Sequence, residues 1–105
     1  MDLIENDGCV FDQNQLRHSH GFELLDPVGR EAFVNPMHME GENAAVEAES
    51  IIESWIKEMR LRWPGRIFRI YPQIDPTEIT IRFHQIRPGV PNWCEQDIEI
   101  ITVTT

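Results

Sequence analysis

The sequence has few cysteines and no long hydrophobic run. No uninterrupted apolar stretch exceeds three residues, which excludes a transmembrane helix of about 20 apolar residues. The acidic start over residues 1–5 also lacks the basic and apolar regions of a secretory signal. We therefore expect a cytoplasmic protein. In that reducing compartment Cys9 and Cys94, the two cysteines, are most simply free thiols, and a disulfide between them is the alternative.

Signatures of catalysis are missing as well. The sequence contains no GxSxG nucleophile elbow, no glycine-rich phosphate loop and no HExxH zinc motif. The glutamates at positions 47, 49, 53 and 58 are spread over the polar side of a predicted helix, where acids serve solvation and complement the helix dipole. These absences argue against an enzyme without deciding the question, and they name no cofactor.

Basic residues are scarce in the first half of the chain. Residues 1–56 contain twelve acids against two arginines, a net charge of −10, whereas residues 57–105 contain six acids and seven bases, a net charge of +1. The switch from Glu53 to Lys57 matches the dipole of the predicted helix and so has a local cause. Outside that helix, residues 1–42 still contain nine acids against two arginines. This surplus predicts a surface for a basic partner.

The clearest periodicity predicts a helix over residues 43–63. Its apolar residues recur at steps of three or four and form one stripe, which comprises Ala45, Ala48, Ile52, Trp55, Ile56, Met59 and Trp63. Asn43 is placed to cap the helix, and Pro64-Gly65 ends it.

Turn residues and alternation predict five strands around this helix. Asp26-Pro27-Val28-Gly29 fits a type I turn and predicts a hairpin over residues 21–35. Three more strands are expected over residues 66–71, 78–86 and 97–104. In the middle one, Ile79, Ile81 and Phe83 alternate with Thr80, Arg82 and His84, as in a half-buried strand.

The predicted fold is a two-layer α+β domain, with one long helix packed on an antiparallel sheet. The expected order is strand, strand, helix, strand, strand, strand, since one apolar helix stripe needs one sheet face to cover it. This single domain spans residues 21–105. Residues 1–20 show no sustained period and are expected to form a partly ordered N-terminal arm.

Histidines near the arm and the start of the helix suggest a metal site. His18 and His20 lie two residues apart, and His38 with Glu40 repeats that spacing. Together they would offer three nitrogens and a carboxylate to a zinc-like ion. The alternative is that these histidines are solvent-exposed in flexible connections.

Arginines and aromatic residues suggest a second kind of site. Arg69, Arg82 and His84 are expected on the exposed face of adjacent strands, near Tyr71, where they would grip single-stranded nucleic acid or an acidic peptide. Alternatively, the arginines pair across strands with acids in residues 97–99. The net charge of −9 disfavours nucleic acid.

The connection over residues 87–94 displays Trp93 between two prolines and a cysteine. Tryptophan is enriched at binding hot spots, so this segment is a candidate recognition loop. Trp93 would equally serve as a lid on the helix–sheet core. The two interpretations remain open at the level of sequence.

Taken together, these patterns predict a small acidic interaction module of unknown specific function. Its expected partner is a basic protein, which it would bind as an inhibitor or immunity-type protein does. The alternative is a small-molecule or metal-binding protein, and so an enzyme, with its site near His18, His20 and His38. A homodimer is compatible with both, because a second copy would protect a half-covered sheet face.

Overall fold

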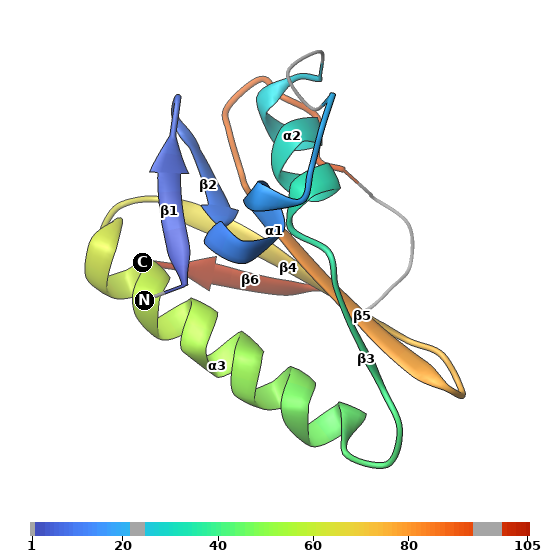
Figure 1. Cartoon of the computed structure of the whole chain (residues 1–105). Coiled ribbons are helices and arrows are strands. Elements are labelled where there is room, and N and C mark those ends of the chain that lie inside the picture. The colour runs from blue at the N-terminus through green and yellow to red at the C-terminus, as the bar shows by residue number, and fades with distance from the viewer. Residues whose placement is uncertain (1, 22–24, 94–99) are drawn as a thin grey trace.

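The computed structural model describes residues 2–21, 25–93 and 100–105 and has a four-stranded antiparallel sheet at its centre. The strand order is β3-β5-β4-β6, with bounds Met37–Glu40 for β3, Ile67–Ile74 for β4, Glu78–Gln85 for β5 and Ile101–Thr104 for β6. The long helix α3, Ala44–Arg62, runs along this sheet (Figure 1). The predicted α+β class, with one long helix on an antiparallel sheet, is confirmed.

The helix α3 formed almost where its apolar stripe predicted. Trp55 and Met59 are buried against the sheet, while Ala44 takes the buried place predicted for Ala45. Asn43 occupies the N-cap position without a side-chain capping bond. Within the described ranges, α3 and the other helices are too short or too polar to cross a membrane.

The elements before α3 differ from the predicted order. Residues of the expected arm form a separate hairpin, β1 (Leu3–Asn6) and β2 (Cys9–Asp12), followed by the short helix α1 (Gln13–Arg17). A second helix, α2, spans Pro27–Val34. Figure 1 draws the hairpin and α2 together above the sheet, with α3 below it.

The hairpin predicted over residues 21–35 is wrong, because Asp26-Pro27 starts a helix. The Asp26 carboxylate accepts a hydrogen bond from the Gly29 amide at 2.6 Å, and Pro27 occupies the first helical turn. An aspartate followed by proline favours both a type I turn and a helix N-terminus. Burial at helical spacing, Val28 and Ala32, favours the helix. Residues 22–24 of that predicted hairpin lie outside the described residues.

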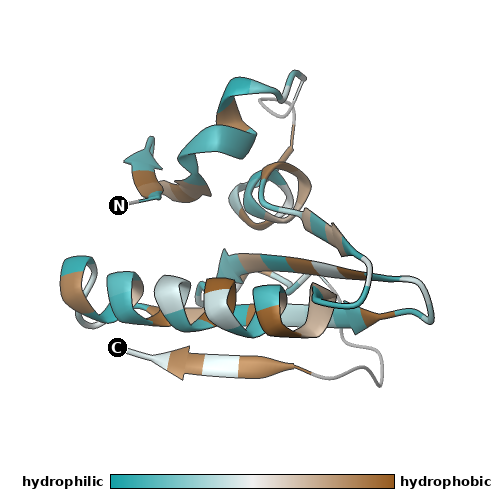
Figure 2. Ribbon diagram, turned by 60° about the horizontal axis from the view of Figure 1, so that its bottom comes forward, coloured by the Kyte–Doolittle hydropathy of each residue, from teal (hydrophilic) through white to brown (hydrophobic). Residues whose placement is uncertain are grey.

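The main core lies between α3 and the sheet. Phe83 on β5 packs edge-on against Trp55 with ring centroids 4.8 Å apart, and Phe68 on β4 lies 6.4 Å from Phe83. Figure 2 shows the apolar segments of α3 and the strands facing each other in this layer. The predicted inward direction of Ile79, Ile81 and Phe83 is confirmed, since all three belong to the core cluster that contains Trp55 and Met59 of α3.

The opposite face of the sheet is covered as well, which the alternation of polar residues did not predict. His84 and Tyr71 are fully buried there, beneath α2 and the segment that carries Trp93. The expectation of an exposed second face is therefore wrong for these two residues. The physical reason is that residues 27–34 form the helix α2, which packs on β5. The predicted hairpin would have left β5 uncovered.

Two buried glutamates attach the N-terminal hairpin to the rest of the fold. Glu58 of α3 accepts hydrogen bonds from the backbone amides of Asp2 and Leu3, at 3.0 and 2.9 Å. Glu31 of α2 accepts one from the Val10 amide at 2.7 Å. Backbone amides at the edges of the hairpin would otherwise need water as a hydrogen-bond acceptor. The two carboxylates accept these bonds instead, so the hairpin packs as part of the domain.

Candidate functional site

The predicted basic and aromatic residues meet on the second face of the sheet. The strand register pairs Arg69 with His84 and Tyr71 with Arg82, so the predicted adjacency is present. The Arg82 guanidinium stacks over Trp93 with its carbon 4.2 Å from the ring centroid, and Trp93 meets Tyr71 edge-on at 5.1 Å. Trp93 therefore covers this face of the sheet, rather than the core beneath α3, while remaining 38% exposed.

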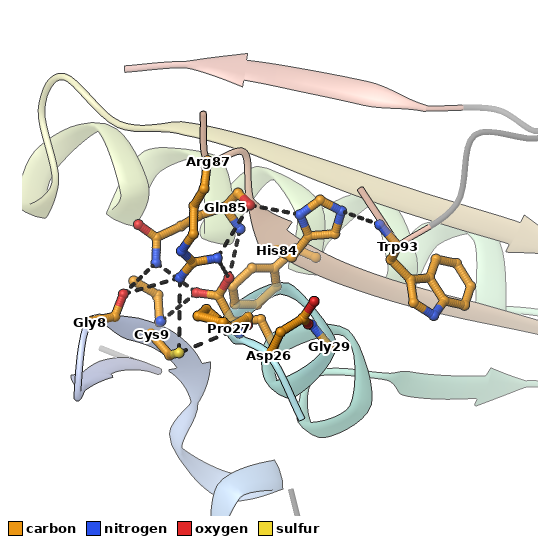
Figure 3. A network of polar contacts seen from close by, with 12 residues as sticks. Gly8, Cys9, Asp26, Pro27, Gly29, His84, Gln85, Arg87 and Trp93 are labelled. Atoms are coloured by element: carbon orange, nitrogen blue, oxygen red, sulfur yellow. Dashed lines mark hydrogen bonds and ion pairs between the residues drawn. The ribbon is translucent and has the colours of Figure 1, made fainter. Parts of the chain in front are cut away.

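His84 at the centre of this cluster is held as a neutral imidazole. Its Nδ1 lies 2.8 Å from the Gln85 carbonyl oxygen, which only accepts, so Nδ1 carries the proton. Its Nε2 accepts from the Tyr71 hydroxyl at 2.7 Å. It also lies 3.3 Å from the Trp93 amide nitrogen, which donates to it (Figure 3). Burial lowers the pKa of His84 below its ordinary value. Both nitrogens are occupied, so the imidazole positions Trp93 and offers no lone pair to a metal or substrate.

This buried histidine makes stability depend on pH. Between the ordinary pKa of 6.5 and the lower folded-state value, the unfolded chain binds a proton that the folded chain does not. Stability is therefore retained above pH 6.5 and falls as the pH drops below it, by up to about 1.4 kcal/mol per pH unit. Urea unfolding of the wild type and of His84→Gln at several pH values should show this loss in the wild type alone.

The exposed His18 provides the control for that measurement. His18→Gln removes an imidazole with no buried contacts, so its pH profile should follow the wild type. If His84→Gln kept the full dependence below pH 6.5, another group would be responsible and the assignment to His84 would be wrong.

The residues proposed for a metal site lie apart. His18 and His20 are exposed after α1, and His38 is on β3 with its Nδ1 2.8 Å from the Thr80 hydroxyl. Glu40 ends β3 opposite Glu78. Among residues 2–21, 25–93 and 100–105, no group of three or more His, Cys, Asp or Glu side chains is arranged to hold a metal ion. The geometry gives the predicted zinc-like site no support.

Several acids of residues 1–42 are engaged inside the fold. Glu31 is buried and pairs with Arg87 at 2.7 Å, and Asp12 is buried at the start of α1. Glu5 pairs with Arg66 at 2.8 Å, which lowers the pKa of the Glu5 carboxyl. Some carboxylates of the N-terminal segment are thus buried or paired within the fold. These three acids are therefore not available to a basic partner.

Acids that form no ion pair among the residues the structure describes gather at one end of the sheet, around the end of β3, the start of α3 and the β4–β5 turn. Residues 31–56 and 72–81 contain no lysine or arginine. The acids that extend from these segments form what we call the acidic end: Glu40, Glu42, Glu47, Glu49, Glu53, Asp75 and Glu78. Cross-strand pairing of Glu40 with Glu78 shows that the segments adjoin. Lys57 follows Glu53 by one helical turn, but seven carboxylates in two segments that themselves contain no lysine or arginine still create a negative field.

An apolar groove of about 340 Å³ opens within the acidic end. One wall is α3, which presents Ala48 and Ile52 with Glu49 and Glu53 among them. The other wall belongs to the strands and contains Pro72, Ile74, Ile79 and Ile101. Ile74 is 68% exposed. The groove therefore joins exposed apolar surface to negative charge, a combination suited to an amphipathic basic ligand.

A second cavity, of about 490 Å³, lies where the N-terminal segment meets β3 and α3. We call it the arm pocket, and its lining residues are Asp2, Asp12, Gln13, Asn14, Arg17, Met37, Ser50, Ile51, Ser54 and Trp55. The sequence suggested a small-molecule or metal site near this junction, with His18, His20 and His38, and these three histidines are not among the residues that line this cavity.

The groove of the acidic end was not predicted from the sequence. Ile52 and Ile79 were assigned to the buried face of the helix and strand, since periodicity predicts a face and not a gap in it. The absence of bases from residues 31–56 and 72–81 was the one signal that would have located the acidic end.

Comparison of the chain with known protein families, with curated proteins and with solved structures finds no match.

Proposed function

We propose that this protein is an interaction module that binds a basic partner segment in the groove of the acidic end. The observation that carries the proposal is the juxtaposition of an open apolar groove with the seven carboxylates of the acidic end, near which Lys57, one helical turn after Glu53, is a base. Charge would attract and orient the partner, and apolar side chains inserted beside Ile74 and Ile52 would hold it. An inhibitor or immunity-type protein directed at a basic target would act in this way.

The chemistry of the groove also defines the partner. Glu49 and Glu53 lie one helical turn apart on α3, a spacing that suits lysine or arginine residues at the same interval on a helical segment. The apolar residues between the walls favour leucine-like side chains on the opposite face of that segment. The partner we infer is an amphipathic basic helix.

A designed peptide tests this proposal directly. The probe is a 16-residue helix with leucines on one face and lysines on the other, titrated against ¹⁵N-labelled protein. We expect the amide signals of Ile74 and Ile79 to shift, and 0.5 M salt to weaken binding because it screens the charges. Glu49→Gln combined with Glu53→Gln should weaken binding at least tenfold, and Ile74→Ser should do the same.

Matched controls separate the site from net charge. His18→Lys combined with His20→Lys changes the net charge by the same two units at exposed positions outside the acidic end and should leave most of the affinity. Leu61→Ser removes an exposed apolar residue at the other end of α3 and should have no effect. Equal losses in the control and groove variants, or binding of a glutamate-for-lysine peptide, would contradict the proposal.

A further inference from the structure

The arm pocket is separate from the groove and is built for a different kind of ligand. The β1–β2 hairpin and α1 contribute Asp2, Asp12 and Arg17, and α3 contributes Ser50, Ser54 and the edge of Trp55. Its volume of about 490 Å³ falls within the range of about 300–1,000 Å³ common for small-molecule sites. Polar and apolar residues line it together, so it suits a ligand with both characters.

The buried charge of the pocket is negative. Asp12 is only 3% exposed, and its carboxylate accepts a hydrogen bond from the Gln15 amide at 3.1 Å. Burial raises the pKa of the Asp12 carboxyl, and the nearby charges of Asp2 and Glu58 raise it further. Among the residues that the structure describes, neither Asp2 nor Asp12 forms an ion pair. The cations near these two acids are Arg62, which pairs with Glu58, and Arg17, which lines the pocket.

The cation that lines the pocket is more exposed than Asp12. Arg17 lies in the last turn of α1 and is exposed, so solvent screens its charge, whereas Asp12 is shielded. A ligand that enters the cavity therefore meets one shielded carboxylate, Asp12, beside the exposed Asp2 and Arg17.

We propose that the arm pocket binds a small aliphatic cation, with its ammonium or guanidinium group at Asp12 and Asp2. Its hydrocarbon stem lies against Met37, Ile51 and Trp55. The hydroxyl groups of Ser50 and Ser54 line the same cavity and accept further N–H hydrogen bonds. This site is independent of the groove and goes beyond the proposed function.

Agmatine is the probe for this site, because it carries an ammonium and a guanidinium group on a four-carbon stem. In a titration of ¹⁵N-labelled protein, we expect shifts at the amides of Gln15 and Ser54 and at the indole of Trp55. Glutarate, an aliphatic dianion of similar length, should cause none. Binding should weaken as the pH falls, since the proton and the cation compete for Asp12.

The decisive variant is Asp12→Asn, which removes the charge and keeps the helix cap, because asparagine caps a helix as well as aspartate does. We expect agmatine to bind at least tenfold more weakly. Asp7→Asn removes an equal charge from an exposed site with a φ of 53°, which asparagine tolerates, and should bind agmatine normally.

Each result of this experiment bears on the proposal. It is overturned if agmatine causes no shifts at millimolar concentration, if it shifts only the amides of the acidic end, or if a folded Asp12→Asn protein binds it as the wild type does. The lysine–leucine peptide assay described for the groove is unaffected by these outcomes, so the two sites succeed or fail separately.

Discussion

Replacing Glu31 by alanine should destabilise the fold by about 3–5 kcal/mol, the usual cost of leaving one partner of a buried ion pair alone. The Glu31 carboxylate is fully buried and accepts four hydrogen bonds. They come from the Val10 amide, the Gln85 amide and side chain, and the Arg87 guanidinium, at 2.7–2.9 Å. Without the carboxylate, the backbone amides of Val10 and Gln85 lose their acceptor, and the largely buried Arg87 guanidinium loses its counter-charge and keeps only carbonyl acceptors such as that of Gly8. Urea unfolding measures the loss.

Two further variants resolve the source of this effect. Glu53→Ala removes an exposed acid from α3 and should change stability by no more than about 0.5 kcal/mol. Glu31→Ala combined with Arg87→Met removes both charges and should be less destabilised than the sum of the single variants, because neither charge is then left alone. A small effect of Glu31→Ala would mean that water replaces the carboxylate and that the site is not closed.

The second large effect is expected for Phe83→Ala, at about 3–5 kcal/mol, the range measured for removing a buried aromatic ring. Phe83 is fully buried on β5 between Trp55 and Phe68. Its removal opens a cavity bounded by α3 on one side and by two strands on the other. Neither layer collapses readily, so the cost should lie towards the upper part of that range. Thermal unfolding followed by circular dichroism measures the shift.

Phe33 is the matched control for this variant, because it is 54% exposed on α2. Phe33→Ala removes the same atoms from a largely solvated position and should cost less than about 1 kcal/mol. If both phenylalanine variants lost similar stability, the layer between α3 and the sheet would not be the principal core.

Regular periodicity was enough to predict the long helix and the central strand. The repeat from Ala48 to Trp63 places α3 within one residue at each end, and the alternation through β5 identifies the residues that face it. The segment Asp26-Pro27 could not be assigned with equal success. Its local sequence fits two structures, and burial of Glu31 by distant partners selects one of them.

The candidate sites were less accessible from sequence than the fold. The adjacency of Arg82, His84 and Tyr71 followed from strand register, whereas the covering of that face by Trp93 depends on α2. Both cavities arise from how separate elements meet, which no local pattern encodes. The charge of each segment predicted more about the sites than any motif did. Two segments without lysine or arginine still form an acidic surface when the fold places them side by side.

The two buried glutamates have a consequence for how the domain opens. Glu58 and Glu31 hold backbone amides of the N-terminal hairpin, at Leu3 and Val10, although they belong to different helices. Detaching the hairpin would take these donors from both carboxylates, so opening at this end breaks buried contacts to α2 and α3 at the same time. The N-terminal hairpin should therefore unfold together with the rest of the domain, in a single cooperative transition.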